Sequence, residues 1–358
     1  MSIPVRDIIV IGASAGGVEA LSKLIESLPA DLPAAIFVVQ HIPAFAPSRL
    51  HRVLSGYTEL TVKAAEDGES IRPGTIYVAQ ADRHLIVEEG RVVLPKGPKE
   101  NRFRPAIDAL FRSAAYTYGD RTIGIVLSGT LNDGTSGMWA INRVGGITMV
   151  QDPEEALFGD MPESVMQYTQ VDYCLPAAEL GQKLSMLVTE SLPLAKSETH
   201  TRAPGDQAPS DTEMLGIEVE VAKGKSALDM GILNFGERSD LACPECHGAL
   251  TQFREGALLR YRCHTGHSHT AESLLVGIND NIEKSMWEVM RGMEESYILM
   301  ERLAHQLEGV GQTRAAEEYH TRAQRIKRQA SEMQHDILAN LRTSAGGITE
   351  PSQHTFEM

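Results

Sequence analysis

The chain has 358 residues, of which 42% are hydrophobic and 23% charged, values typical of a soluble globular protein with room for two or more domains. Its formal net charge of −15 argues against nucleic acid as the main partner, because phosphate binding needs clustered Lys and Arg. No apolar run approaches the roughly 20 residues that span a bilayer, and no basic region precedes an apolar signal core. We therefore expect a cytoplasmic protein without membrane insertion.

From residue 7 to about residue 194, apolar runs alternate with amphipathic stretches, as in chains built from βαβ units. Several runs are solidly apolar, which is typical of parallel strands covered by helices on both faces. The run over residues 84–94 is interrupted by Glu88-Glu89-Gly90 and predicts an antiparallel hairpin. We predict a doubly wound, mostly parallel α/β sheet with this hairpin appended. The expected strands are residues 8–12, 34–40, 74–79, 84–94, 122–129, 146–150 and 171–175.

The three most hydrophobic of these runs are followed by polar residues suited to hydrolysis. Ser14 follows the first, His41 follows the second, and Asp133 follows the run that ends near residue 129. Because function collects at the carboxyl ends of parallel strands, they are candidates for a nucleophile, a base and an orienting carboxylate. Each also has a simpler interpretation. The glycine-rich turn at Ser14 suits a phosphate, His41 suits an ordinary loop, and Asp133 suits a turn.

The turn around Ser14 favours the hydrolytic interpretation. Residues 12–16 read Gly-Ala-Ser-Ala-Gly and fit the G-x-S-x-G strand-to-helix elbow, whereas the stretch has neither G-x-G-x-x-G nor a P-loop ending. Ala15 and Gly16 are small enough to let an acyl group approach. The backbone N–H of Ala15, near the start of the following helix, is the candidate donor to an oxyanion. We expect no cofactor for catalysis.

These residues lie in stretches that resemble the catalytic domain of the chemotaxis receptor protein-glutamate methylesterases, the CheB family. The matching stretches cover roughly residues 5 to 190 in the same order: VIGASAGGVEAL, VVQHIP, GTIYVAQADRHLIV, RPAIDALFRSAA, GIVLSGTLNDGTSGM and QDPEEALFGDMPESV. The resemblance implies hydrolysis of glutamate γ-methyl esters on receptor helices, with release of methanol, and deamidation of some receptor glutamines. It also implies a catalytic triad of Ser14, His41 and Asp133.

Three features depart from the family pattern. Ala15 stands where the best-studied members have threonine, and Thr130 stands three residues before Asp133, where a methionine is usual. Both changes bear on substrate contacts. The first catalytic strand begins near residue 7, so we expect no receiver domain and no control by phosphorylation in cis. Two alternatives stay open: hydrolysis of another carboxyl ester outside chemotaxis, and a non-enzymatic scaffold that recruits a partner through its tail.

Beyond a catalytic domain over residues 1–194, the composition changes. Residues 195–213 lack large apolar side chains and are rich in Pro, Ser, Thr and charge, which predicts a disordered linker. Cys243 and Cys246 then form a C-x₂-C knuckle, and Cys263 opens the sequence CHTGH. This spacing predicts a structural zinc ion in a zinc-ribbon-like module over residues 214–270.

The fourth zinc ligand is His267, His264 or His247. We favour His267, because its separation from Cys263 lets the chain fold back over the metal and Gly266 eases the turn. The remaining cysteine, Cys174, follows an apolar run and is expected to be a buried small hydrophobe.

Two long helix patterns follow, broken at Gly309-Val310-Gly311, and predict an antiparallel hairpin over residues 271–343 before a flexible tail over 344–358. Together with CPEC and RYRCHTGH, the stretch SMWEVMRGMEES resembles the tail of receiver-less relatives. We expect the helices to form a coiled-coil interaction element. They would fold on themselves, form a homo-oligomer, or bind a partner protein, besides the methylated receptor helices or other methylated protein that the domain would act on. The two heptad seams are Met286, Met290, Met293, Tyr297 and Met300, and Tyr319, Ala323, Ile326, Ala330, Met333 and Ile337.

Overall fold

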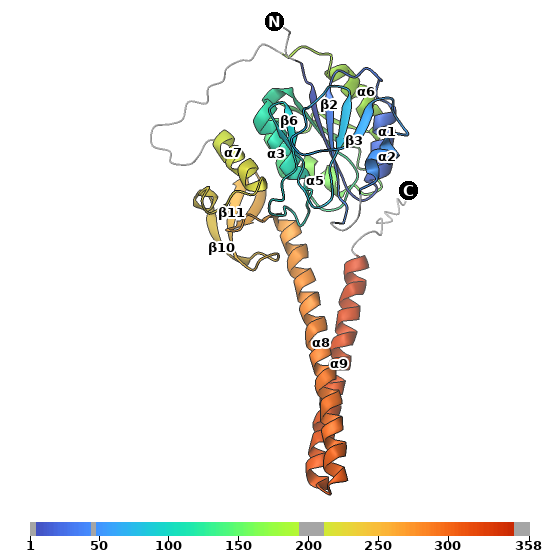
Figure 1. Ribbon diagram of the computed structural model, residues 1–358, viewed down its shortest axis with the longest axis vertical. Helices are drawn as coiled ribbons and strands as arrows, with labels where there is room; N and C mark the ends of the chain where they lie inside the picture. The colour runs from blue at the N-terminus through green and yellow to red at the C-terminus, as the bar shows by residue number, and fades with distance from the viewer. Residues whose placement is uncertain (1–4, 44–47, 193–210, 347–358) are drawn as a thin grey trace, which may run out of the picture. The chain divides into compact units, whose positions relative to one another are not determined.

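The computed structural model describes residues 5–43, 48–192 and 211–346 (Figure 1). It divides the chain into two compact units, residues 1–275 and residues 276–358. The first unit holds the predicted α/β sheet and the cysteine-rich segment, and the second holds most of the helical hairpin.

A seven-stranded parallel sheet forms the centre of the first unit, which confirms the predicted fold class. Its strand order is β3-β4-β2-β1-β7-β8-β9, so the chain leaves β1 in one direction along the sheet and returns beside β1 with β7. The bounds are β1 (Ile8–Ala13), β2 (Ala35–Gln40), β3 (Thr61–Ala64), β4 (Thr75–Val78), β7 (Thr122–Val126), β8 (Ile147–Gln151) and β9 (Tyr173–Leu175).

The two edge strands differ from the sequence-based expectations. β3 was not predicted, because Thr61–Ala64 is a short edge strand in which no residue is fully buried and no apolar run exists. In β9, Cys174 is exposed, so the expectation of a buried cysteine is wrong. An edge strand has a neighbour on one side only, and here the outward-facing position goes to the cysteine.

Helices cover both faces of the sheet, and β1 shows why. Ile9 and Ile11 point into one core while Ile8 and Val10 point into the other, so this strand is buried on both sides. The first face carries α1 (Gly17–Glu26), α2 (Leu50–Leu54) and α6 (Ala177–Leu187), and the second carries α3 (Ile107–Tyr118), α4 (Thr135–Arg143) and α5 (Asp160–Tyr168) (Figure 1). The predicted hairpin is confirmed as β5 (Ile86–Glu88) and β6 (Arg91–Val93), beside the second core, and a short 3₁₀ helix, η1 (Gly119–Arg121), precedes β7.

The first unit is completed by a smaller segment, residues 211–275, which we call the C-terminal module. It contains α7 (Asp211–Ala222), the 3₁₀ helix η2 (Ile232–Phe235) and an antiparallel sheet ordered β10-β11-β12-β13. The strands are β10 (Glu237–Ala242), β11 (Ala249–Glu255), β12 (Leu258–Cys263) and β13 (Ser268–Thr270). Most of the predicted linker, residues 193–210, lies outside the described residues, but residues 211–213 belong to α7 and not to a linker.

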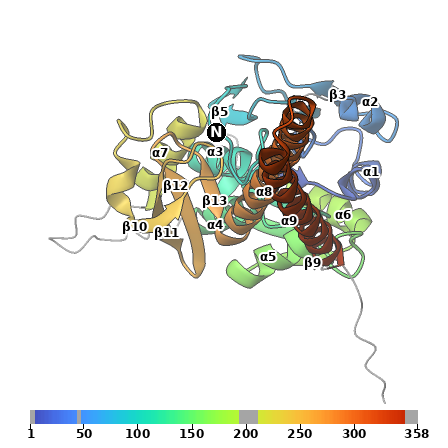
Figure 2. The same cartoon turned by 90° about the horizontal axis from the view of Figure 1, so that it is seen from below.

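The second unit is the predicted helical hairpin, formed by α8 (Ala271–Gly309), whose first turn belongs to the first unit, and α9 (Thr313–Gly346). The helices break at the expected glycines, where Gly311 has a left-handed φ of 79°, and they run side by side in both views (Figure 2). Seam residues Ala323, Ala330 and Ile337 are buried. α9 extends three residues beyond the predicted end, and the rest of the expected tail, residues 347–358, lies outside the described part of the chain. None of the described helices is long and apolar enough to cross a membrane.

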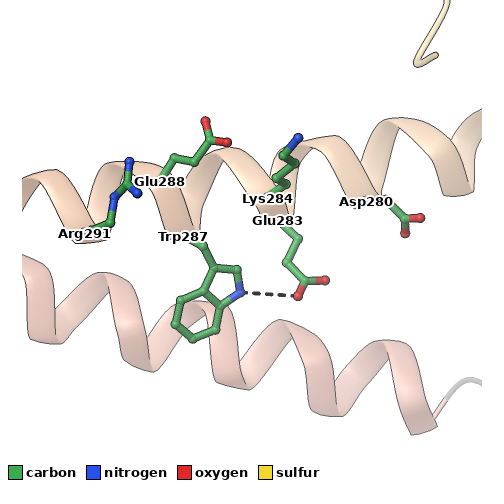
Figure 3. A pocket seen from close by; sticks show the side chains of 6 residues that line it. All are labelled: Asp280, Glu283, Lys284, Trp287, Glu288 and Arg291. Atoms are coloured by element: carbon green, nitrogen blue, oxygen red, sulfur yellow. Dashed lines mark hydrogen bonds between the residues drawn. The ribbon is translucent and has the colours of Figure 1, made fainter.

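Within the hairpin, α8 bears a shallow pocket of mixed charge (Figure 3). Trp287 points from α8 toward the facing helix, and its Nε1 donates a hydrogen bond to Glu283 over 3.4 Å. All six lining side chains come from this one helix: Asp280, Glu283, Lys284, Trp287, Glu288 and Arg291.

Candidate functional site

Ser14 stands directly after β1, between the two strands that flank β1 in the sheet. Its backbone N–H donates to the carbonyl of Ser128 after β7 (2.9 Å). On the other side, Gln40 at the end of β2 donates from Nε2 to the Ser14 carbonyl (2.7 Å). The turn is therefore held from both sides at the point where the strand order reverses, which is where α/β sheets bind their ligands.

Two glycines allow the chain to pack closely around Ser14. Gly16 caps α1 with a left-handed φ of 72°, and a Cβ on it would lie 2.7 Å from Ser128 Oγ. A Cβ on Gly129 would lie 2.8 Å from the Ser14 Cβ. Thr130 follows Gly129 in the same loop and is half-buried. The loop after β7 thus passes directly beside the serine.

The structure brings Ser14, His41 and Asp133 into a line of contacts. His41 Nδ1 lies 3.1 Å from Ser14 Oγ, and His41 Nε2 lies 2.8 Å from Asp133 Oδ2. The side chains of His41 and Asp133 are only 4% and 1% exposed. Because a carboxylate accepts at Nε2, that nitrogen carries the proton in the neutral ring, and Nδ1 is left to accept from the serine hydroxyl.

Asp133 is held as an anion by donors from several elements. Besides His41, its oxygens accept from the backbone N–H groups of Ile107 (2.7 Å) and Asp108 (3.2 Å) and from Asn101 Nδ2 (2.9 Å). Burial by itself would raise the pKa of the Asp133 carboxyl. The interaction with His41, followed by the bonds from Asn101 and Ile107, outweighs burial and holds this pKa below its ordinary value.

A second buried carboxyl, Asp108, lies on α3 beside Asp133. Its Oδ1 accepts from the backbone N–H groups of Gly134 (3.1 Å) and Gly137 (2.7 Å). Burial, with the nearby charge of Asp133, raises the pKa of Asp108 to about 7. The site therefore contains one carboxyl favoured as an anion and one that binds a proton near neutral pH.

Sequence reasoning missed three residues of this site, namely Asp108, Asn101 and Phe103. Phe103 stacks on the His41 ring with their centroids 3.6 Å apart and their planes within 8°. Asp108 lies inside the stretch RPAIDALFRSAA, and the only local signal for Asn101 is its position in a polar turn. Their roles depend on contacts between elements distant in the sequence.

The candidate metal ligands gather in the C-terminal module. Cys243, Cys246, Cys263 and His267 offer one donor atom each, and these four atoms all lie within 4.8 Å of one another. The module adds His269, which the sequence did not single out and whose Nε2 lies 3.6 Å from Cys243 Sγ. The other two histidines weighed as ligands, His247 and His264, are exposed and outside this group.

The fold and the strand-end site together define an α/β protein in which a serine, a histidine and an aspartate lie in a line of contacts at the carboxyl edge of a parallel sheet. The family model for CheB methylesterase matches residues 9–184. A putative protein-glutamate methylesterase/protein-glutamine glutaminase of Leptospira interrogans is 37% identical over 175 residues, which cover 49% of this chain and 91% of that protein. The chain belongs to the CheB methylesterase family.

Two comparisons with Thermotoga maritima agree. Its protein-glutamate methylesterase/protein-glutamine glutaminase is 41% identical over 185 residues, which are 51% of this chain and 54% of that protein. The crystal structure of its CheB methylesterase catalytic domain matches with a TM-score of 0.50 and 40% identity, covering 52% of this chain and all of the domain. The chain spans about half the length of several curated relatives that it matches.

Proposed function

We propose that the chain is a serine hydrolase that removes methyl groups from glutamate γ-methyl esters on chemoreceptor helices. The observation that carries this proposal is the contact line from Ser14 Oγ through the His41 ring to Asp133. Membership of the CheB methylesterase family and the names of its relatives support the substrate class.

In the proposed reaction, Ser14 Oγ attacks the ester carbon while His41 Nδ1 takes the hydroxyl proton. Asp133 stabilises the imidazolium that forms at His41. The same proton then passes to the departing methoxide, methanol leaves, and a glutamyl ester of Ser14 remains. A water molecule, activated by His41 in the same way, releases the free glutamate and restores the serine.

The tetrahedral intermediates need a donor for the negative oxygen. We assign this role to the Ala15 N–H, because among the described residues no carbonyl or side-chain acceptor occupies it. It stands beside the start of α1, where the helix dipole also favours negative charge.

The same residues would support hydrolysis of a glutamine side chain, with ammonia in place of methanol as the leaving group. Several relatives carry both activities in their names. The amide is the harder substrate, so we place deamidation second to ester hydrolysis.

The test is methanol release from a methylated chemoreceptor by the full chain. We expect release by the wild type, background release by Ser14→Ala, and normal release by a control variant, Ser55→Ala, in which an exposed serine after α2 is changed in the same way. Full activity of Ser14→Ala would reject the proposal. Hydrolysis of small esters without any release from the receptor would favour another carboxyl ester as the substrate.

We also propose that Cys243, Cys246, Cys263 and His267 bind a structural zinc ion. Three sulfurs and one imidazole nitrogen form a common zinc donor set. The Sγ atoms of Cys246 and Cys263 are 3.6 Å apart, and Cys263 Sγ is 3.6 Å from His267 Nδ1. Donors around tetrahedral zinc lie about 3.3–3.8 Å from each other, so the set fits. Four protein donors leave no position for a substrate, which makes the role structural.

A further inference from the structure

The C-terminal module docks on a turn that reaches the site. Residues 100–103 form a tight turn in which Glu100 and Phe103 exchange backbone hydrogen bonds of 3.1 and 2.8 Å. β13 runs along this turn, with the N–H of Asn101 donating to the Ser268 carbonyl (2.8 Å). The turn therefore joins the catalytic half of the first unit to the module.

The backbone of this turn is strained. Asn101 and Arg102 have φ values of 47° and 75°, in the left-handed region that residues with a Cβ rarely occupy. Two such residues in succession cost roughly 1 kcal/mol each or more, and such costs persist only where the surroundings enforce them. Here the enforcing contact is β13.

The module also decides which way the Asn101 amide faces. Its Oδ1 accepts from the backbone N–H of Thr270 (3.0 Å) and from the hydroxyl of Ser273 (3.2 Å). Its Nδ2 donates to Asp133 Oδ1 (2.9 Å) and to Asp108 Oδ2 (2.8 Å). A flipped amide would set a carbonyl oxygen against two carboxyl groups, and the two module donors would keep only their bonds to each other's residues.

A second connection runs parallel to the first. The hydroxyl of Thr270 donates to Asn132 Oδ1 (2.6 Å), and Asn132 Nδ2 donates to Glu272 in the first turn of α8 (2.8 Å). Asn132 is the neighbour of Asp133 in the chain. The start of α8 is therefore bonded to Asn101, which donates to Asp133, and to Asn132, which precedes Asp133 in the chain.

We propose that Asn101 is a positioning residue for the Asp133–His41 pair, and that the C-terminal module holds Asn101 in place through Thr270 and Ser273. The module would then help to orient the catalytic residues of the proposed esterase. This inference rests on the proposed hydrolytic function of Ser14.

The charged and titratable groups that face Asp133 come from several elements. They are His41 after β2, Asp108 on α3, His84 before β5 and, through Asn132, Glu272 of the module. Burial lowers the pKa of His84, which keeps this ring neutral. Loss of the Asn101 N–H removes a bond that favours the Asp133 anion, so the Asp133–His41 pair should take up a proton at higher pH.

The test measures how fast an alkyl phosphonate modifies Ser14 in the full-length protein as a function of pH, a readout that needs no natural substrate. For Asn101→Leu we expect the modification rate on the plateau of the pH profile to be about tenfold lower. The midpoint of the acidic limb of that profile should lie higher by about half a pH unit or more. Thr270→Val combined with Ser273→Ala removes the hydroxyl bonds to Asn132 and Asn101 but keeps the Thr270 backbone N–H, so it should move the limb in the same direction by a smaller amount. The matched control is Asn142→Leu, which removes an amide on α4 that donates to the Gln170 carbonyl (3.0 Å). It should leave the pH profile unchanged.

A limb that stays at the wild-type pH in Asn101→Leu would overturn the proposal, because mere loss of folded protein reduces the amount of protein modified and leaves the rate constant of the folded fraction unchanged. A shift in Asn101→Leu without one in the Thr270/Ser273 variant would overturn the part assigned to the side chains of the module. Wild-type protein that is modified at Ser14 but releases no methanol from receptor would instead reject the proposed substrate and leave the positioning role standing.

Discussion

Gly16 shows how a single residue shapes the site. Its left-handed φ of 72° would cost an alanine about 1 kcal/mol, and the added Cβ would also approach Leu157 Cβ to 2.8 Å. Ser128, the other neighbour of that Cβ, accepts from Phe158 N–H and donates to the Ala15 carbonyl. A side chain at Gly16 must therefore displace the loops that follow β7 and β8.

We expect Gly16→Ala to lower the free energy of unfolding by roughly 2–3 kcal/mol and esterase activity at least about tenfold. Gly90→Ala is the matched control, since Gly90 has a φ of 70° but nothing within 4 Å of an added Cβ. It should cost only the backbone term, about 1 kcal/mol, and keep full activity. Denaturant unfolding and activity per folded molecule distinguish the two, and equal effects at both glycines would contradict this account of the turn.

At this scale the sequence predicts the site residues that follow strands. It misses those that reach the site from a turn elsewhere in the chain. Ser14, His41 and Asp133 could be chosen because each comes after an apolar run, and the structure places them in contact. Asn101 and Phe103 occupy a turn between elements, and nothing local indicates that one reaches Asp133 and the other His41. His267 could be favoured because ligand spacing is a local property.

Among the elements, α7 of the C-terminal module is joined to α3 through buried charges. Glu218 pairs with Arg112 of α3 and with Arg260 and Arg262 of β12, and all four side chains are at least nine-tenths buried. Burial would raise the pKa of Glu218, but Arg260, Arg112 and Arg262 together hold it well below its ordinary value. Removing one charge from such a cluster leaves its partners uncompensated in the interior.

Glu218→Gln should therefore destabilise the first unit by about 3 kcal/mol at pH 7. Because the folded pKa lies below the unfolded one, this contribution is present above the unfolded pKa of about 4.3 and is lost as pH falls further. Glu220→Gln, two residues along α7, breaks only partly exposed pairs with Lys223 and Lys225 and should cost less than about 1 kcal/mol. Unfolding curves at pH 7 and pH 3.5 test both, and similar losses at pH 7 would contradict the argument.

The elements that escaped prediction share a physical reason. β3 is a four-residue edge strand with little apolar content. α7 carries the stretch IEVEVA, whose alternating β-branched and acidic residues do not repeat with a helical period. Its Val219 and Ala222 side chains are buried in a cluster with Ile86, Ala106 and Ala109, so tertiary packing stabilises a helix that local pattern does not indicate.

On the scale of the whole molecule, the chain consists of fewer independent parts than its composition suggests. The sequence predicts residues 1–194 and 214–270 as separate domains, whereas the structure groups both in one compact unit. They share a core, in which Val219 and Ala222 pack with residues of α3 and β5. Such shared burial depends on shape, which composition cannot report.

If zinc holds the module together, its loss should weaken this entire unit. We expect about one zinc per chain in washed protein, far less in Cys246→Ser, and a thermal midpoint lower in that variant by roughly 5 °C or more. Cys174→Ser, which changes an exposed cysteine outside the ligand group, should keep both the zinc and the midpoint. Wild-type protein with far less than one zinc would contradict the proposed site.

The most direct measurement of the central claim is receptor methanol release by Ser14→Ala, His41→Ala and the double variant, each assayed at equal folded concentration beside wild type. If one alcohol, one ring and one carboxylate act as a single unit, each substitution should lower kcat by roughly 10³-fold or more, and the double variant should be no slower than the slower single variant. Release that persists in Ser14→Ala, or losses that multiply in the double variant, would contradict the account.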